Sequence, residues 1–375
     1  MEILLSTDQS LLRDTARKFL ESQVPLTAVR GLESNLEGFE RDWWRDASEF
    51  GWTSLLVPEH LGGGSVSEHG LLDLVLIAEE FGRAVGPGPL LPVNVVAAAL
   101  SRSDNRTMCD EILPGLMSGR EIAAWAFYEG GGAWDGQSVK LRAERGGSHF
   151  ELTGQKTMVE AGYGADHYFV TALTDEGLMN CILPAGSPGL TVTPMQSLDL
   201  VRRFAHLDFD HVLVSDESVL AGPDEVEESI AWLLRLALVL QCHETNGAIS
   251  RVFEMTLDYA ENRYAFGRTL GSYQALKHRF ADMKMWLEGC HGIATHAARA
   301  VANGTADSRE LTCAAKAYVG ERSTDLIEDC VQLHGGIGVT WEHDLHLYLR
   351  RATTNRVTYG TPQEHREQIA RLLDL

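Results

Sequence analysis

The spacing of apolar positions divides the chain into three segments. In the first, to about residue 120, leucine, alanine and phenylalanine recur at helical intervals over residues 10–24, and Ser6 or Thr7 is placed to cap that helix. Residues 71–85 form a second, strongly apolar helical stretch, which the Gly-Pro-Gly-Pro run directly after it ends. The pattern predicts an all-α domain over residues 1–120.

The second segment alternates in the manner of β-strands. Residues 149–157 and 205–214 alternate apolar and polar side chains, and residues 167–184 predict two strands around a Thr-Asp-Glu-Gly turn. We therefore expect a β domain over residues 121–222.

The third segment, residues 223–375, returns to long helices. Helical periodicity predicts four helices, over residues 227–267, 275–304, 308–335 and 341–357. The glycine-containing stretch 265–274 separates the first two. The predicted fold class is α+β multidomain, with a helical bundle, a β domain and a second helical bundle in that order.

Composition narrows the range of partners and compartments. The 375 residues carry a net charge of −21, which argues against a nucleic-acid partner and gives no reason to expect an anionic membrane surface. No stretch reaches about 18 uninterrupted apolar residues, and the first residues lack a signal peptide's basic region. The six cysteines form no CxxC pair, so we expect small buried hydrophobes rather than disulfides or zinc ligands, and a cytoplasmic protein.

Two glycine-broken joints in the third segment carry candidate binding chemistry. Residues 332–338 (QLHGGIG) end a helix with glycines that let a backbone approach a phosphate or a ring, although a plain helix cap reads the same way. The joint at residues 261–275 holds Arg263, Phe266 and Gln274, which could grip a pyrophosphate, an aromatic system and a ring edge. The alternative is an inter-helix corner with solvated arginines.

Other familiar sites are excluded by spacing. The glycine-rich loop 127–136 is not a GxGxxG between a strand and a helix, and no Walker lysine is present. His343 and His346 lie three residues apart on a helix, but no third ligand is evident, so no metal is expected.

These motifs together resemble the acyl-CoA dehydrogenases, flavoproteins of the β-oxidation type. The resemblance runs through nearly the whole chain and is strongest in RYAFGRTLGSYQALKHRFADM (263–283) and VQLHGGIGVTWEHDLHLYLRRA (331–352). It implies a helical bundle, a β-barrel-like domain and a four-helix bundle. It also implies FAD as cofactor, an acyl-CoA thioester as substrate, desaturation to the 2-enoyl-CoA, and an electron-transfer flavoprotein or similar acceptor.

The resemblance also implies which residues contact FAD. In the family's tetramer, the C-terminal motifs reach across to the FAD seated on a neighbouring subunit. Carried onto this sequence, the cofactor-binding residues are Arg263, Phe266, Gln274, Gln332, Leu333, His334, Gly335, Gly336, Thr361 and Gln363.

The catalytic position departs from the family pattern. The family's catalytic glutamate stands in a Tyr-Glu-Gly-Thr loop, and alignment on Gly360-Thr361 places Tyr359 there, whose phenol is a poor base near neutral pH. The alternative family position, on the helix that opens the third segment, holds Ala237. Glu244, two turns further along, is the nearest acid and a weak candidate base.

The flavin-facing motifs of the β segment depart as well. In the family loop Thr-Glu-Pro-Gly-Ala-Gly-Ser-Asp a small hydroxyl faces the cofactor, and Trp134 takes its place here. The family's Trp-Ile-Thr becomes Met158-Val159-Glu160, and we expect Glu160 to repel an anionic reduced flavin.

The losses and the retentions point to a subunit role. Motifs that serve the chain's own active site are degraded, whereas those that reach a neighbour's FAD are kept. The leading hypothesis is a non-catalytic subunit of an α2β2 acyl-CoA dehydrogenase, similar to bacterial complexes that act on bulky acyl-CoAs such as steroid side chains or on dicarboxylyl-CoAs. The alternatives are a self-sufficient homotetramer with a non-standard base, a flavin-dependent monooxygenase or oxidase on the same fold, and a binding subunit without a flavin role.

Overall fold

The computed structural model describes residues 5–374 and begins with a helical region. The N-terminal helices are α1 (Thr7–Gln23), α2 (Leu26–Gly31), α3 (Arg41–Ser48), α4 (Gly70–Ala84), α5 (Leu90–Arg102) and α6 (Arg106–Met117). The Ser6 hydroxyl caps α1, accepting a hydrogen bond from the amide of Gln9 while the Gln9 side chain bonds back to Ser6. The predicted start of this helix is confirmed.

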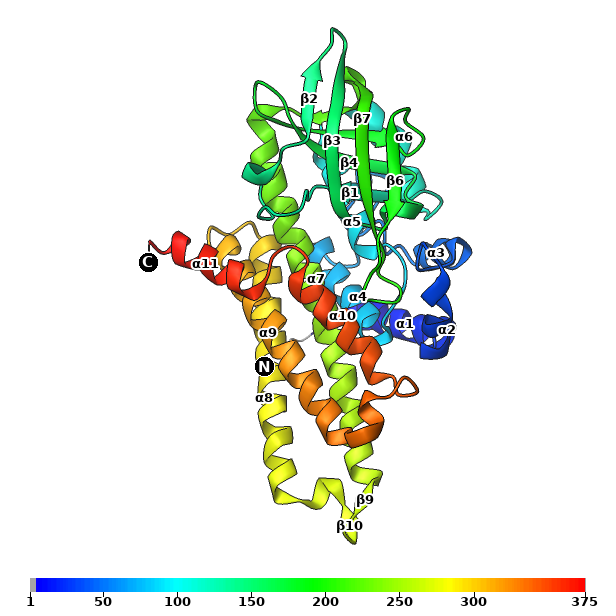
Figure 1. The fold of residues 1–375 in the computed structure, drawn as a ribbon, viewed down its shortest axis with the longest axis vertical. Helices are drawn as coiled ribbons and strands as arrows, with labels where there is room; N and C mark the ends of the chain where they lie inside the picture. Colours follow the sequence, from blue (N-terminus) through cyan, green and yellow to red (C-terminus); the bar gives the residue numbers. More distant parts are fainter. Residues whose placement is uncertain (1–4, 375) are drawn as a thin grey trace. The chain divides into compact units, whose positions relative to one another are not determined.

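A mixed sheet follows. Its strands are β1 (Ala123–Ala126), β2 (Arg142–Arg145), β3 (His149–Glu160), β4 (His167–Leu173), β5 (Leu178–Pro184), β6 (Leu190–Pro194), β7 (Phe204–Ser215) and β8 (Val219–Ala221). The strand order is β6-β7-β3-β2-β4-β5-β8, with β1 added parallel to β4 (Figure 1). Among the described residues β6 and β8 do not pair, so the sheet is open and the expected barrel-like closure is wrong. Both end strands are short, which limits further pairing at the edges.

The alternating stretches predict the long strands correctly. β3, β4, β5 and β7 lie where the pattern places them, and the turn between β4 and β5 joins Thr174 to Gly177. The sequence missed β1, β2, β6 and β8. β1 is four consecutive buried residues, and such a run carries no alternation that would separate it from a helix.

The C-terminal region is again helical. Its helices are α7 (Pro223–Asn262), α8 (Gln274–Ala302), α9 (Ser308–His334), α10 (Leu345–Val357) and α11 (Pro362–Leu372). Helical domains thus flank a middle sheet domain, and the predicted fold class is confirmed. α7 ends five residues earlier than expected, because a hairpin of β9 (Tyr264–Ala265) and β10 (Arg268–Thr269) begins there. Phe266 and Gly267 at its turn both have positive φ, as a tight hairpin turn requires.

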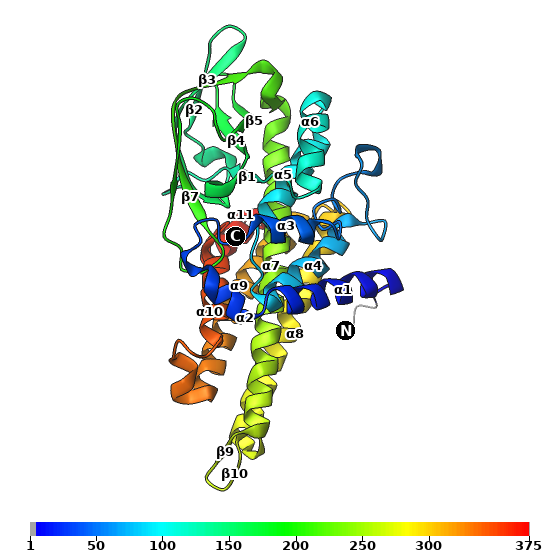
Figure 2. The same cartoon turned by 90° about the vertical axis from the view of Figure 1, so that its right-hand side faces the viewer.

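Packing divides the described chain into two units. The helical unit contains the chain up to Val29, Val75–Gly86 and everything from Leu238 onward. The sheet unit contains Arg30–Leu74 and Pro87–Ala237, so α5 and α6 pack with the sheet, as the second view shows (Figure 2). The helices α4 and α7 each run from one unit into the other. The domain boundaries at residues 120 and 222 stay predictions.

Inside the helical unit, α4 and α7 cross with their backbones in contact. A Cβ added to Gly82 would lie 1.7 Å from the carbonyl oxygen of Glu244, and one added to Gly247 would lie 1.8 Å from that of Glu79. Real Cβ atoms do not approach oxygen so closely, so each helix needs a glycine at the crossing.

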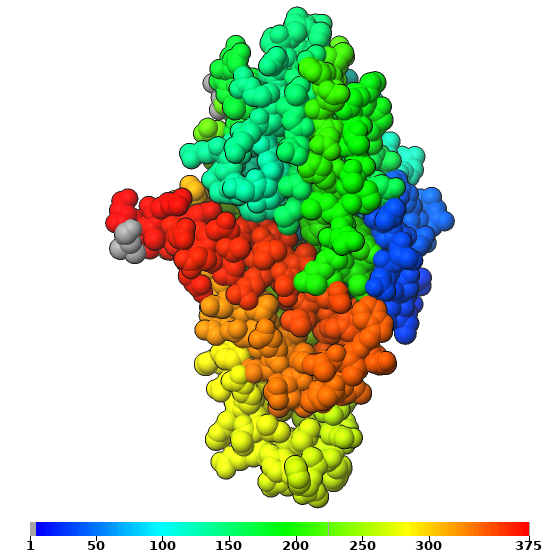
Figure 3. All heavy atoms as spheres, viewed as in Figure 1, coloured from blue at the N-terminus to red at the C-terminus, as the bar shows by residue number. Residues whose placement is uncertain are grey.

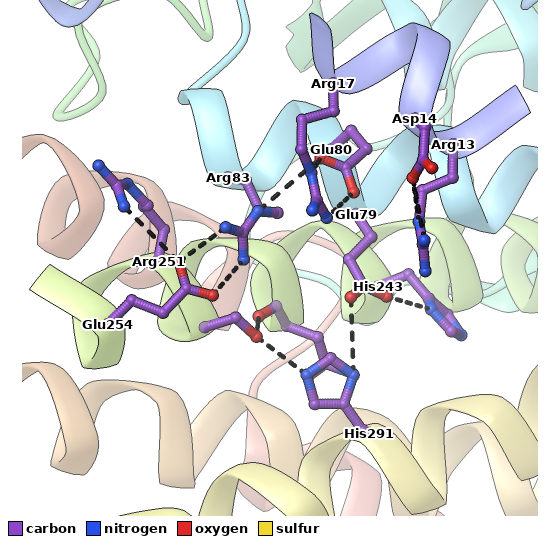
Figure 4. Close-up of polar contacts among 12 residues, drawn as sticks. Arg13, Asp14, Arg17, Glu79, Glu80, Arg83, His243, Arg251, Glu254 and His291 are labelled. Carbon is purple, nitrogen blue, oxygen red and sulfur yellow. Dashed lines mark hydrogen bonds and ion pairs between the residues drawn. The ribbon is translucent and has the colours of Figure 1, made fainter. Parts of the chain in front are cut away.

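Polar side chains surround this crossing in a linked cluster (Figure 4). The buried carboxylate of Glu80 accepts two hydrogen bonds from Arg17 of α1, at 2.7 and 2.9 Å, and lies 3.8 Å from Arg83. Burial raises the pKa of Glu80, and Arg17 partly offsets that rise. Arg83 in turn donates to Glu254 of α7 at 2.7 Å. The cluster therefore ties α1, α4 and α7 together.

Glu79 completes the cluster on the side of α8. Its carboxylate lies 3.7 Å from Nδ1 of His243 and 3.8 Å from Nδ1 of His291 (Figure 4). Burial opposes ionisation of this carboxyl, but the two imidazoles outweigh burial and hold the pKa of Glu79 below its usual value.

Substituting either crossing glycine tests the close approach. Gly82→Ala or Gly247→Ala forces α4 and α7 apart, and we expect a loss of about 3 kcal/mol in the free energy of unfolding, measured by urea denaturation. Gly292→Ala is the matched control, because it lies within α8 with no atom within 4 Å of an added Cβ; it should stabilise by about 0.5–1 kcal/mol. Equal effects at Gly82 and Gly292 would contradict the crossing.

Candidate functional site

The β9–β10 hairpin places three of the predicted cofactor residues at one surface of the helical unit. The amide of Arg263 donates to the carbonyl of Tyr259 at 2.8 Å as α7 ends, and the Phe266 side chain is 99% exposed at the turn. Tyr273 donates its hydroxyl hydrogen bond to the carbonyl of Ala265 at 2.8 Å, which fixes the hairpin against the start of α8, where Gln274 is the first residue. This surface lies in the yellow region of Figure 3.

The end of α9 lies beside the end of α7, from which the hairpin begins. The ring of Tyr259 stacks on His334 with centroids 4.4 Å apart, which joins the end of α7 to the end of α9. Gly335 has φ of 66°, and nothing lies within 4 Å of a Cβ added to Gly335 or Gly336, so the backbone is open to an approaching group. We call Arg263, Phe266, Gln274 and residues 332–336 the hairpin cluster.

Thr361 and Gln363 lie elsewhere in the helical unit. Pro362, between them, packs on Gly320 of α9, and the twelve residues from there to Gln332 span about 18 Å at the helical rise. The Thr361 hydroxyl accepts from the amide of Glu364 in a capping box. The structure therefore does not bring these two residues to the hairpin cluster, and their cofactor role stays a prediction.

The two catalytic candidates lie around one buried asparagine, Asn355. Glu244, 5% exposed, accepts hydrogen bonds at both carboxylate oxygens, from Arg351 at 2.7 Å and from Asn355 at 3.1 Å. Arg351 is 1% exposed. A carboxylate held this way is an ion-pair partner within the core, and both of its oxygens already accept a hydrogen bond.

Tyr359 follows four residues after Asn355 in the loop between α10 and α11. Its side chain is 6% exposed and its backbone has a φ of 61°, which is uncommon for a residue with a Cβ. Ala237, the alternative family position for the base, is fully buried and has no acidic group.

Sequence reasoning missed Lys316, which lies beside this loop. Its ammonium is 2% exposed and donates to the side chain of Gln241 and to the carbonyls of Asn355 and Thr358, the last at 2.7 Å. A signal was present, because Lys316 stands three residues from both Cys313 and Val319 on the apolar face of α9.

The glycine-rich loop of the sheet unit is packed by its own side chains. Trp134 stacks on Tyr128 with centroids 4.3 Å apart and planes 10° from parallel. Glu129 accepts hydrogen bonds from the amides of Lys140 and Leu141 and from the buried ammonium of Lys156, at 2.7, 2.9 and 2.6 Å. Burial lowers the pKa of Lys156 to about 8, against the pull of Glu129. The cavity lined by this loop holds only about 10 Å³.

Glu160 does not carry an isolated charge. Nε of Arg202 lies 3.0 Å from its carboxylate, and both side chains are buried. Arg202 therefore compensates the charge that we expected to repel a reduced flavin. The backbone beside Glu160 is irregular, because Met158 and Ala161 have positive φ and the pairing of β3 with β7 shifts register nearby.

The remaining candidate groups show no catalytic or metal arrangement. His343 packs edge-on against His334, and His346 stacks on Trp341. Within residues 5–374 no three His, Cys, Asp or Glu side chains are grouped to hold a metal, and no helix is long and apolar enough to cross a membrane. All six cysteines are free and buried, as predicted.

Comparison with known proteins decides the family. Residues 6–120 match the acyl-CoA dehydrogenase N-terminal domain, and residues 232–373 match the acyl-CoA dehydrogenase C-terminal domain. The chain belongs to the acyl-CoA dehydrogenase family. Members of this family are oxidoreductases that depend on FAD.

Individual relatives cover the whole chain. The acyl-CoA dehydrogenase IpdE2 of Mycolicibacterium smegmatis is 29% identical over 98% of this chain and 98% of its own length. The ChsE4–ChsE5 complex from Mycobacterium tuberculosis superposes with a TM-score of 0.88 at 26% identity, covering 100% of this chain and 99% of that chain. The Tcur3481–Tcur3483 steroid ACAD superposes with a TM-score of 0.87 at 25% identity, covering 98% and 97%.

The residues of this acyl-CoA dehydrogenase family member fit FAD unevenly. The hairpin cluster fits one side of a dinucleotide, because it presents an exposed guanidinium, an exposed ring and open glycine backbone. The loop 128–135 does not fit a flavin ring, because Trp134 stacks on Tyr128 and the cavity that the loop lines holds only about 10 Å³.

The buried pair Arg351–Glu244 yields a stability test. Arg351→Met leaves the Glu244 carboxylate buried without its ion-pair partner, and we expect unfolding in urea to become easier by about 3–5 kcal/mol. The double variant Arg351→Met/Glu244→Gln should recover much of this loss. As a control, Lys284→Met removes an exposed pair with Glu288 and should change stability by roughly 0.5 kcal/mol or less. Additive effects of the two core substitutions would contradict the coupling.

Proposed function

We propose that this chain is the non-catalytic subunit of a heteromeric, α2β2 acyl-CoA dehydrogenase. A paralogous partner carries the catalytic glutamate and seats FAD, and this chain completes the partner's FAD site with its hairpin cluster. The observation that carries the proposal is a contrast within one chain. Apart from the buried His334, the hairpin cluster is exposed or half-exposed and its glycine backbone is open, whereas in the loop that would face a flavin on this chain Trp134 stacks on Tyr128.

The roles of the hairpin cluster follow from its chemistry. Arg263 binds the pyrophosphate by charge-assisted hydrogen bonds, Phe266 packs on an aromatic ring, and the Gln274 and Gln332 amides bind polar edges. The open backbone at Gly335 and Gly336 allows close approach. FAD, when bound, supplies the hydride acceptor for α,β-desaturation of the acyl-CoA.

The states of the two candidate bases support assigning catalysis to the partner. Tyr359 stands at the position of the family's glutamate, and a phenol is a poor substitute for a carboxylate base. Glu244 is the other candidate, but Arg351 and Asn355 each donate a hydrogen bond to one of its oxygens. Proton abstraction by this chain would require breaking a buried ion pair.

Similarity to a solved heteromeric complex, ChsE4–ChsE5, supports the pairing with a paralogue. Similarity to a steroid ACAD supports a bulky acyl-CoA, such as a steroid side chain, as the substrate class. We further propose a cytoplasmic complex that passes electrons to an electron-transfer flavoprotein or a similar acceptor.

Three competing functions make different predictions. A self-sufficient homotetramer using Glu244 would turn over alone and lose turnover in Glu244→Gln. A monooxygenase or oxidase would consume oxygen with reduced flavin. A binding subunit without a flavin role would tolerate loss of Arg263, and the exposed, open hairpin cluster favours a flavin role over it.

Flavin content tests the proposal most directly. Purified alone, the chain should hold close to zero FAD per chain by flavin absorbance, because the cavity lined by its own flavin-facing loop is too small for a flavin ring. Co-expressed with a paralogue that carries glutamate at the position of Tyr359, it should give a complex with one FAD per two chains. One FAD per chain in the isolated protein, with full turnover, would refute the proposal.

The hairpin cluster can be tested within that complex. Arg263→Ala removes the proposed pyrophosphate ligand and should lower the FAD content at least tenfold at limiting FAD, a loss of roughly 1.4 kcal/mol or more. Arg309→Ala, an exposed arginine at the other end of α9, is the matched control and should leave FAD content unchanged. Equal retention of FAD in both variants would exclude the role of Arg263.

A further inference from the structure

The backbone around Tyr359 is held from several sides by contacts that do not involve the Tyr359 side chain. From α9, Lys316 donates to the carbonyls of Asn355 and Thr358 at the end of α10. From α11, Nε2 of His365 donates to the carbonyl of Tyr359 itself, at 3.0 Å. Two buried side chains thus bind three carbonyls within five residues of chain.

Packing closes the same segment tightly. A Cβ added to Gly360 would lie 2.8 Å from Nε2 of His365, so the imidazole lies against the backbone there. Gly360 has a φ of 102° and Tyr359 a φ of 61°, so two successive residues adopt left-handed backbone. Pro362 packs on Gly320 of α9, and Thr361 caps α11, which fixes the segment at its far end.

The ammonium of Lys316 donates to neutral acceptors. Its three acceptors are two backbone carbonyls and the Gln241 amide oxygen. Carbonyls at the end of α10 carry the negative end of the helix dipole, so they suit a buried cation. All three ammonium donors are used, which leaves none for a substrate or a cofactor.

We propose that Lys316 and His365 are positioning residues that fix the backbone of Asn355–Gly360 and so set where the side chain of residue 359 stands, whatever that side chain is. We call this braced segment, Asn355–Gly360, the mount of residue 359. This inference concerns the chain's own backbone and does not depend on a partner subunit.

The contacts that hold this segment include a histidine, His365, whose protonation depends on pH. His365 is 2% exposed; its Nε2 hydrogen bonds to the Tyr359 carbonyl and its Nδ1 has no hydrogen-bond partner. Burial, and then the charge of Lys316, lower the pKa of His365 to about 4, while the Tyr359 carbonyl and Glu364 act in the opposite direction. The charged groups that act on the ring are thus Lys316 from α9 and Glu364 from α11.

The lowered pKa of His365 determines whether the closed segment gains or loses stability as the pH falls. The closed segment binds the imidazole in its neutral form, and the open segment lets it titrate near its ordinary pKa of 6.5. The open state therefore binds more protons between pH 6.5 and 4, and the closed state loses stability as the pH falls through that window. Between pH 7 and pH 5 the open population should rise roughly 20-fold.

Hydrogen–deuterium exchange of the full-length protein measures this opening at the amides of residues 357–360. After correction for intrinsic exchange rates, we expect the roughly 20-fold increase at pH 5 in the natural sequence and a flat profile in His365→Gln, which cannot titrate. His278→Gln, an exposed histidine of α8, is the matched control and should keep the 20-fold change. If His365 had only a structural role, His365→Gln would change protection by the same factor at pH 7 and at pH 5.

Two further variants separate the mount from the side chain that it carries. Tyr359→Phe keeps the backbone carbonyls that make the holding contacts, so it should change exchange of residues 357–360 far less than Lys316→Met does. Lys316→Met should increase exchange there more than in α7 at neutral pH. A greater loss of protection in Tyr359→Phe than in Lys316→Met, or the same pH profile in His365→Gln and His278→Gln, would overturn the proposal even if flavin content supports the subunit role.

Discussion

The helical unit depends on the contact between the backbones of α4 and α7. Glycines at 82 and 247 allow the two helices to touch, and any side chain there would force them apart. This approach brings Glu79 and Glu80 of α4 against α7 and lets one arginine–glutamate chain tie α1 to both helices. It also fixes the part of α7 that carries Glu244, because Gly82 packs on the carbonyl of Glu244 itself.

A fixed α7 explains how the two candidate regions of the helical unit come to differ. At Glu244, α7 is surrounded by α4 and α10, so its polar side chain must be neutralised, and Arg351 and Asn355 do this. Fifteen residues further along, about 22 Å at the helical rise, Tyr259 meets His334 and the chain turns into the exposed hairpin. One helix thus links a closed polar core to an open binding surface.

Local sequence signals predicted the elements that depend on local chemistry. The glycines after His334 and the Phe-Gly pair at 266–267 mark a helix end and a turn directly, so the hairpin cluster could be inferred before the structure was known. The strand β1 and the Arg351–Glu244 pair could not be inferred in this way. Distant parts of the chain decide whether four apolar residues, or two charges, become buried. The ion-pair partner of Glu160 could not be predicted for the same reason, since Arg202 lies 42 residues away in sequence.

The mount beneath Tyr359 is informative because it contains features that cost stability. A tyrosine in the left-handed conformation and a buried ammonium each lower stability unless the surroundings compensate. A loop whose only purpose was to connect α10 to α11 would have no need of either feature. The mount carries a phenol at the position where the family has its glutamate, so a constrained backbone here presents a side chain that is a poor base. Geometry of this kind stays useful when the same helices α7 and α9 must still hold the hairpin cluster in register, since Gln241 and Lys316, which brace the mount, belong to those two helices.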